Sequence, residues 1–121
     1  MPIRVLIVDD MSQVRQDLRT LLDLSEGIEI VGEASDGLEA IRRIATLRPD
    51  VVLLDLEMPV LDGFQTASRI KALYPSCRII ALTVHDHDSA LQKALQAGVN
   101  SFIVKGSPIE MLIQAILERE E

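Results

Sequence analysis

Acidic residues directly follow two apolar runs of this sequence. Asp9 and Asp10 follow the run RVLIV, and Asp55 ends the run VVLLD, with Glu57 two residues beyond it. Carboxylates brought close together raise one another's pKa unless a cation joins them. A small set of oxygen ligands shared with water suits Mg²⁺, with Mn²⁺ as an alternative ion, better than zinc, which prefers nitrogen and sulfur. If these acids meet in the fold, they predict a magnesium site that takes its remaining oxygens from a phosphate.

A hydroxyl and an ammonium group follow two other apolar runs. Thr83 comes after RIIAL and Lys105 after SFIV, and both donors suit a phosphoryl group beside a metal ion. No serine or cysteine with a neighbouring base stands at these positions, so the candidate nucleophile is a carboxylate, which can attack phosphorus to give an aspartyl phosphate. Asp55 is the best placed acid for this role. Taken singly, Asp55 could be a turn residue, the pair Asp9-Asp10 a helix cap and Lys105 a surface lysine.

The alternation of apolar runs with helix-like segments indicates how these side chains are positioned. Between the runs, apolar residues recur every three or four positions, as Leu18, Leu21 and Leu22 do in the first segment. Strict alternation of strands and helices predicts an α/β domain with a parallel sheet covered by helices on both faces. Functional groups of such folds collect at the carboxyl ends of the strands. The expected strands are Ile3–Val8, Ile28–Ala34, Val51–Leu54, Arg78–Leu82 and Ser101–Val104.

The expected helix ends carry local signals. Three segments place a capping side chain three residues before Glu or Gln, which is the pattern of a capping box: Asp36 with Glu39, Asp62 with Gln65, and Ser107 with Glu110. Pro108 suits the first helical position, and Gly98 and Pro75 are expected just beyond the ends of helices.

Composition limits the classes of protein that need to be considered. The 121 residues suffice for one domain, and with only two Phe, one Tyr and no Trp its core must be aliphatic. The formal net charge of -7 argues against direct binding of nucleic acid or of an anionic membrane, because both need a basic surface. A single cysteine, Cys77, suits a reducing cytosol and is expected to be a packing residue. With no secretory signal and no apolar segment of membrane-spanning length, we expect a cytoplasmic protein.

Taken together, these residues resemble the receiver domains of bacterial two-component response regulators. The resemblance covers the whole chain and rests on four motifs in order: Val8-Asp9-Asp10, LLDLEMPVLDG at residues 53–63, Ala81-Leu82-Thr83 and Val104-Lys105. It implies a flavodoxin/CheY-like doubly wound (βα)5 fold whose five-stranded parallel sheet has the order 2-1-3-4-5. The ending Lys105–Pro108, with Ala97–Ser101 upstream, is most similar to receivers attached to a LuxR-type (NarL/FixJ) helix-turn-helix domain.

The resemblance implies a role for each acidic residue. Asp55 corresponds to the phosphoacceptor, which takes a phosphoryl group from a histidine kinase or from a small donor such as acetyl phosphate. Asp10 and Asp55 correspond to direct Mg²⁺ ligands, and Asp9 to a ligand that acts largely through water. Glu57 corresponds to a ligand that acts through its backbone carbonyl. The chain would then be a phosphoacceptor and not an enzyme with a separate substrate.

The resemblance also implies a conformational switch. Thr83 and Lys105 correspond to the pair that contacts the phosphoryl oxygens, and Phe102 to an aromatic residue that turns inward when Thr83 moves toward the phosphate. An ordinary core position is the alternative for Phe102. The implied function is a phosphorylation-activated signalling switch that controls an output such as transcription.

Two positions depart from the commonest receiver pattern. Val84 follows Thr83 where many receivers carry Ala or Gly, and we expect its branched side chain to narrow access to the phosphoryl group and to slow entry or hydrolysis. Gly106 follows Lys105 where the family often has proline. The geometry of the Lys105–Gly106 bond is therefore left open, because a cis bond there would be costly.

The resemblance further suggests how the domain is used. We expect residues 1–121 to form a single receiver domain with the DNA-binding output domain absent from this chain, and an excised receiver is favoured over a natural single-domain protein. The implied partner is a sensor histidine kinase or a phosphotransfer protein, with a second copy of the chain as a further candidate. We expect no contact of this domain with nucleic acid or membrane, although a missing helix-turn-helix domain would bind DNA. Arg15 and Arg19 are interpreted as solvated positions of the first helix, where Arg15 could meet a kinase.

Three other functions are alternatives to the switch. A Mg²⁺-dependent phosphatase of the HAD type also forms an aspartyl phosphate, but it usually has a second aspartate where Glu57 stands and needs a cap for which this chain has no room. An FMN-binding flavodoxin is disfavoured because the first loop, Asp9–Ser12, is acidic and glycine-free. A receiver that acts as a phosphate-independent interaction module stays open. The segment His85–Asp88 contains ligand-like residues for zinc, but such loops are usually polar and their acids can cap the next helix.

Overall fold

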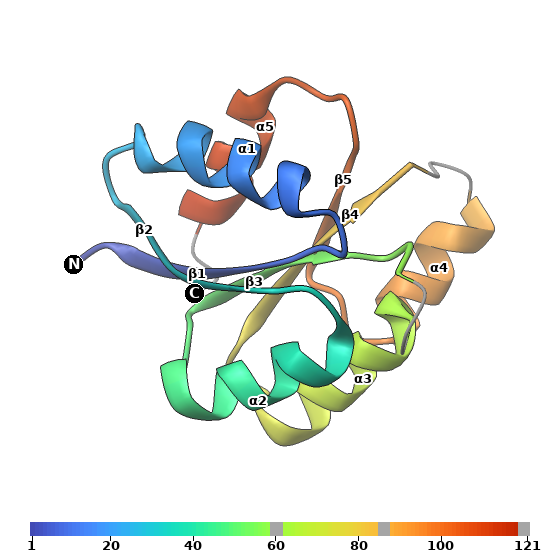
Figure 1. Cartoon of the computed structure of the whole chain (residues 1–121). Helices are drawn as coiled ribbons and strands as arrows, with labels where there is room; N and C mark the ends of the chain where they lie inside the picture. Colours follow the sequence, from blue (N-terminus) through green and yellow to red (C-terminus); the bar gives the residue numbers. More distant parts are fainter. Residues whose placement is uncertain (59–61, 85–87, 119–121) are drawn as a thin grey trace.

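The computed structural model describes residues 1–58, 62–84 and 88–118, in which five strands alternate strictly with five helices (Figure 1). In chain order they are β1 (Ile3–Val8), α1 (Ser12–Asp23), β2 (Ile28–Ala34), α2 (Gly37–Leu47), β3 (Val51–Asp55), α3 (Gly63–Leu73), β4 (Arg78–Thr83), α4 (Asp88–Gln96), β5 (Ser101–Val104) and α5 (Ile109–Leu117). All five predicted strands are confirmed. Strands β3 and β4 extend one residue further than predicted, so that Asp55 and Thr83 end them.

The strands form one parallel sheet in the order β2-β1-β3-β4-β5. This order confirms the doubly wound (βα)5 fold that the resemblance implied. Because β1, β3, β4 and β5 are neighbours and run in the same direction, their carboxyl ends share one edge of the sheet. Strand β2 lies at the outer edge and pairs only with β1.

Helices cover both faces of the sheet and bury an aliphatic core. Figure 1 shows α1 and α5 on one face, where Leu22 and Ile116 pack, and α2, α3 and α4 on the other, where Ile44 and Ile70 pack. Cys77 is buried on this second face, as expected for a packing residue, and burial raises the pKa of its thiol to about 11. Within residues 1–58, 62–84 and 88–118, no helix is both long and apolar enough to cross a bilayer.

Two of the three predicted helix caps are confirmed. The Asp36 carboxylate accepts a hydrogen bond from Glu39 N at 2.8 Å, and Asp62 accepts one from Gln65 N at 2.9 Å. Each cap satisfies one of the amide groups that lack a partner in the first turn of a helix. Gly98, just beyond α4, has a φ of 100°, which is the left-handed conformation expected after a helix end.

The third predicted cap, at the start of α5, is wrong. Pro108 occupies the cap position itself and makes no side-chain cap hydrogen bond, so Ser107 lies one residue too early to cap the helix. The Ser107 amide instead donates to Val104 O at 3.1 Å, in the turn that follows β5. The expectation that Pro108 takes the first helical position is also wrong, because Ile109 is the first residue of α5.

The carboxyl end of α5 is held by a residue of the sheet. Arg78, the first residue of β4, donates from its guanidinium to the backbone carbonyls of Ala115, Ile116 and Glu118, at 2.7 Å for Ile116. Carbonyls in the last turn of a helix have no amide partner within the helix, so Arg78 supplies hydrogen bonds that they would otherwise lack. The amino end of β4 therefore fixes the end of α5.

Candidate functional site

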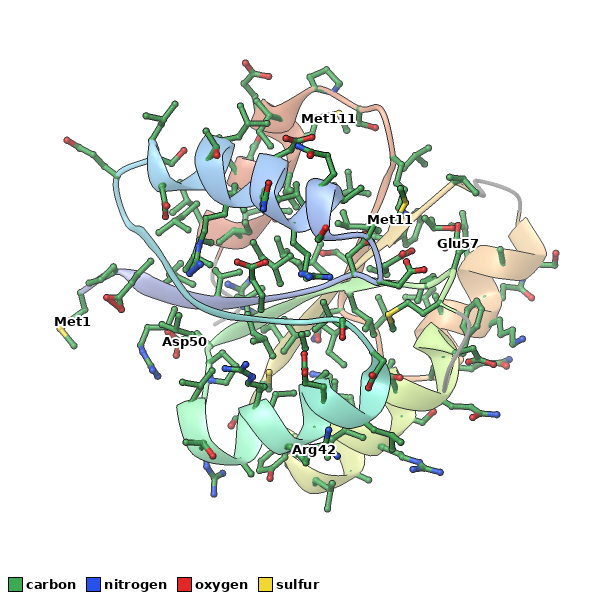
Figure 2. All side chains as sticks on the ribbon, viewed as in Figure 1. Met1, Met11, Arg42, Asp50, Glu57 and Met111 are labelled. Carbon is green, nitrogen blue, oxygen red and sulfur yellow. The ribbon has the colours of Figure 1, made fainter. Side chains whose placement is uncertain are left out.

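Three carboxylates meet at the carboxyl edge of the sheet. Asp9 and Asp10 follow β1, Asp55 ends β3, and each offers an oxygen within 4.8 Å of the others. Asp9 and Asp55 are buried, each with 1% of its surface exposed, whereas Asp10 is exposed. Figure 2 shows Met11, next to the acidic pair, and Glu57 at the same end of the sheet. The predicted convergence of the acids is confirmed.

The two buried acids are held by the backbone that follows them. Met11 N donates to Asp9 Oδ1 at 2.9 Å, and Glu57 N donates to Asp55 Oδ1 at 3.0 Å. In both cases an aspartate accepts a hydrogen bond from the amide two residues later, which is the geometry of an Asx turn. The second oxygen of Asp9, Oδ2, is buried and has no hydrogen-bond partner among the described residues.

A glycine allows α3 to begin against the end of β3. A Cβ added to Gly63 would lie 2.4 Å from Leu56 Cα and 2.8 Å from Asp55 O. Because both are backbone atoms, neither could move aside without displacing the segment that carries Asp55. Gly63 is thus part of the structure that positions this acid.

One lysine faces the acids. Lys105 Nζ lies 3.0 Å from Asp55 Oδ1 and 3.9 Å from Asp9 Oδ2, and 31% of the lysine side chain is exposed. Burial alone would lower the pKa of Lys105, but the hydrogen bond and charge of Asp55 raise it above its ordinary value. Lys105 is therefore charged and offsets part of the negative charge of three carboxylates.

Burial shifts the titration of the two enclosed acids. Burial raises the pKa of Asp55 from 3.8 to about 6, although the Glu57 amide and Lys105 act in the opposite direction. Burial likewise raises the pKa of Asp9. An additional cation would favour the charged form of both groups. The Asp9 oxygen that lacks a hydrogen bond and the all-oxygen donor set fit a hard divalent cation such as Mg²⁺.

The side chain of Glu57 links the ends of β3 and β4. Its Oε1 accepts hydrogen bonds from Thr83 Oγ1 at 3.0 Å and from Val84 N at 2.7 Å, and its Oε2 is buried with no hydrogen-bond partner among the described residues. The sequence interpretation assigned Glu57 only a backbone role and missed this contact. No local pattern indicates it, because 26 residues separate Glu57 from Thr83.

The structure places the other predicted residues as follows. Thr83 is buried at the end of β4, and Val84 beside it is 58% exposed. Phe102 lies opposite Ala81 in the sheet and is half-buried against the core on the α2–α4 face. The backbone contains no cis peptide bond in the part of the chain described, so the Lys105–Gly106 bond is trans. The zinc candidates at 85–87, and the side chain of residue 88, lie outside that part.

Known proteins share both the sequence pattern and the fold. Residues 5–117 match the family described as response regulator receiver domain. The chain belongs to this family. The receiver is 35% identical over 114 residues to the response regulator GacA of Pseudomonas viridiflava, an alignment that covers 94% of this chain and 53% of the relative. The chain thus spans about half the length of that relative.

Solved structures support the assignment to the LuxR-type branch. A LuxR-family two-component response regulator from Aurantimonas sp. matches this receiver with a TM-score of 0.91 at 33% identity, covering 96% of this chain and 83% of that one. A chain of the CheX-CheY-BeF3-Mg complex from Borrelia burgdorferi matches with a TM-score of 0.87 at 31% identity, covering 96% and 87%. The resemblance found in the sequence is confirmed.

Proposed function

We propose that Asp55 accepts a phosphoryl group from a sensor histidine kinase, a phosphotransfer protein or a small phosphodonor, and that this event switches the receiver between two states. The observation that carries the proposal is the position of the Asp55 carboxylate. It is buried at the end of the central strand β3, 3.0 Å from the Lys105 ammonium group and within 4.8 Å of two further carboxylates. The solved complex from Borrelia burgdorferi, whose name includes BeF3 and Mg, supports a metal-dependent phosphoryl site in this fold.

The reaction is a displacement at phosphorus. An Asp55 carboxylate oxygen forms the new bond to phosphorus, while the bond from phosphorus to the donor nitrogen or oxygen breaks and the donor keeps the electron pair. Lys105, and Thr83 through its hydroxyl, would donate hydrogen bonds to the phosphoryl oxygens. Since Thr83 already donates to Glu57 at 3.0 Å, the phosphoryl group would have to replace Glu57 as its acceptor. That exchange of acceptor would start the conformational switch, which is proposed to include Phe102.

Asp9, Asp10 and Asp55, with the backbone carbonyl of Glu57, would hold the Mg²⁺ or Mn²⁺ ion. When bound, such an ion supplies positive charge that offsets the charge of the carboxylates and of the phosphoryl oxygens. Asp9 would offer its buried Oδ2, which has no hydrogen-bond partner among the described residues, for a direct or water-mediated contact. Glu57 would contribute its backbone carbonyl, while its amide donates to Asp55 Oδ1 and its Oε1 accepts from Val84 N.

The assignment of Asp55 is tested by intact-mass measurement after incubation with acetyl phosphate. With Mg²⁺ we expect the mass to rise by one phosphoryl group, and with EDTA we expect no change. Asp55→Asn, whose fold is checked by circular dichroism, should show no gain. A gain that persists in Asp55→Asn would contradict this phosphoacceptor. No gain from either acetyl phosphate or a phosphorylated histidine protein would favour a phosphate-independent interaction module.

The exposed side chain of Val84 is proposed to restrict access to Asp55. It is 58% exposed and adjoins Thr83, and its amide is fixed by Glu57 at 2.7 Å. We expect Val84→Ala to raise the rates of phosphoryl entry and loss by a few-fold, on the order of 1 kcal/mol in each barrier. Both rates are measured by intact-mass spectrometry on reactions quenched at successive times. Equal rates in the parent and in Val84→Ala would show that Val84 does not limit access.

The partners follow from the proposed reaction. The proposed phosphodonor is a sensor histidine kinase or a phosphotransfer protein. A second copy of the chain is a further candidate partner. A cytoplasmic location is proposed because these partners act there. Residues 1–121 are proposed to act as one receiver unit, and binding of DNA is assigned to an output domain outside it because the receiver has a net charge of -7. A phosphatase of the HAD type is not favoured, since Glu57 occupies the acid position and its carboxylate is bound to Thr83 and Val84.

A further inference from the structure

The loop that carries Asp9 and Asp10 has little intrinsic support. It contains no glycine, and Met11 at the cap position of α1 makes no side-chain cap hydrogen bond. Within the loop, Met11 N donates to Asp9 Oδ1 at 2.9 Å. A loop of this kind needs an outside contact if its carboxylates are to keep one geometry.

Arg15 makes one of the outside contacts of this loop. Asp9 N also donates to Ala34 O at 3.1 Å, and Lys105 Nζ lies 3.9 Å from Asp9 Oδ2. The Arg15 NH1 group donates to the backbone carbonyl of Asp9 at 2.6 Å, and its Nε donates to Glu33 Oε1, on β2, at 3.0 Å. Only 17% of the Arg15 side chain is exposed, so the interpretation of Arg15 as a solvated helix position is wrong. The planar guanidinium can hold both acceptors at once, which a lysine ammonium group does less well.

The position of the Asp9 carbonyl affects the orientation of both Asp9 and Asp10. The peptide unit between Asp9 and Asp10 is planar, so a hydrogen bond to its oxygen also fixes the direction in which Asp10 leaves the loop. Glu33 balances the charge of Arg15, which lies close to a site suited to a cation. Through Glu33, the outer strand β2 gains a second connection to the site, beside the hydrogen bond from Asp9 N to Ala34 O at 3.1 Å.

Arg19 provides a matched control within the same network. Its NH1 group donates to the other oxygen of Glu33, Oε2, at 3.0 Å, and NH2 donates to Ile30 O at 3.4 Å. Arg19 lies one helical turn beyond Arg15 and has 39% of its side chain exposed. It shares the carboxylate of Glu33 but, in the part of the chain described, forms no hydrogen bond or ion pair with the Asp9 loop.

We propose that Arg15 is a positioning residue for the acidic site, which holds the Asp9–Asp10 peptide in the orientation that lets both carboxylates bind a divalent cation. This inference rests on the proposed function, because it takes the three acids to be the metal site. It adds a residue that contacts neither the metal ligands' carboxylates nor the phosphoryl group.

The test is binding of Mn²⁺ to the full chain, measured from the electron paramagnetic resonance signal of the free ion. We expect Arg15→Ala to weaken Mn²⁺ binding about 10-fold, Arg15→Lys to weaken it less, and Arg19→Ala to change it by no more than about twofold. Urea unfolding in EDTA is measured for each variant, so that a loss of affinity can be compared with any loss of stability.

The outcomes separate the two proposals. If folded Arg15→Ala binds Mn²⁺ with the affinity of the parent, the positioning role is overturned and the metal site is left intact. The same holds if Arg19→Ala loses as much Mn²⁺ affinity as Arg15→Ala does. Absence of Mn²⁺ binding by the parent chain would contradict the metal site itself, and with it both proposals. A selective loss in Arg15→Ala without a matching loss of stability would support the inference.

Discussion

Asp55→Asn is expected to increase the free energy of unfolding of the metal-free protein near neutral pH, although the same substitution removes the proposed phosphoacceptor. Burial raises the pKa of Asp55 from 3.8 to about 6, which means that the folded protein disfavours the ionised carboxylate. A shift of about two units corresponds to a penalty on the order of 3 kcal/mol at about pH 8. Asparagine removes the charge but retains an oxygen that can accept from Glu57 N.

The pH dependence of this effect has a definite sign. An acid whose folded pKa lies above its unfolded pKa binds more protons in the folded state between the two values, so stability falls as the pH rises from about 4 to about 6. Below that window Asp55 is protonated in both states and the penalty is absent. Above it the full penalty applies.

Urea unfolding of the parent and of Asp55→Asn in EDTA measures this difference. We expect the stability advantage of Asp55→Asn to be small near pH 4 to 5 and to reach its maximum near pH 8. Mg²⁺ should stabilise the parent more than the variant, because binding to the folded state adds stability by mass action and the variant lacks one ligand. An advantage that does not change with pH would contradict the assignment of the penalty to the Asp55 charge.

Lys105→Met is expected to have the opposite effect on stability and to impair phosphoryl uptake. Lys105 Nζ lies 3.0 Å from Asp55 Oδ1 and 3.9 Å from Asp9 Oδ2. Removing this charge leaves two buried carboxylates without their cation, which should cost about 3 kcal/mol in the metal-free protein. The loss of a donor to the phosphoryl oxygens should slow uptake from acetyl phosphate about 100-fold.

A double-mutant cycle with Asp55→Asn isolates the ion pair. In the Asp55→Asn background, Lys105→Met should cost less stability, and the difference between the two costs should be about 1 to 3 kcal/mol. Urea unfolding at one pH, near 8, in EDTA supplies the four free energies that the cycle needs. Additive effects would mean that Lys105 does not stabilise the fold through Asp55.

The fold could be predicted because its signals are local and repeated. The run Val51–Leu54 is apolar at every position, as expected for a strand covered on both faces, and all of its residues are buried. The convergence of Asp9, Asp10 and Asp55 followed from the same reasoning, because parallel strands bring their carboxyl ends to one edge. The strand order was implied by the resemblance to receiver domains.

The side-chain network around the acids could not be predicted in the same way. Glu57 reaches Thr83 across 26 residues, and Arg15 reaches Glu33 across 18. Such contacts depend on the rotation of each side chain and on the distance between elements, and neither leaves a periodic pattern in the sequence. The error at Ser107 has a similar origin, since a capping pattern does not determine which residue starts the helix.

Strand β4 carries a functional contact at each of its ends. Thr83 at its carboxyl end belongs to the acidic site, and Arg78 at its amino end holds the last carbonyls of α5. The strand has six residues and so spans on the order of 20 Å, between neighbours that hold it on both sides. A shift of Thr83 along the strand axis would therefore move Arg78 as well. It would change the hydrogen bonds from Arg78 that hold the carboxyl end of α5.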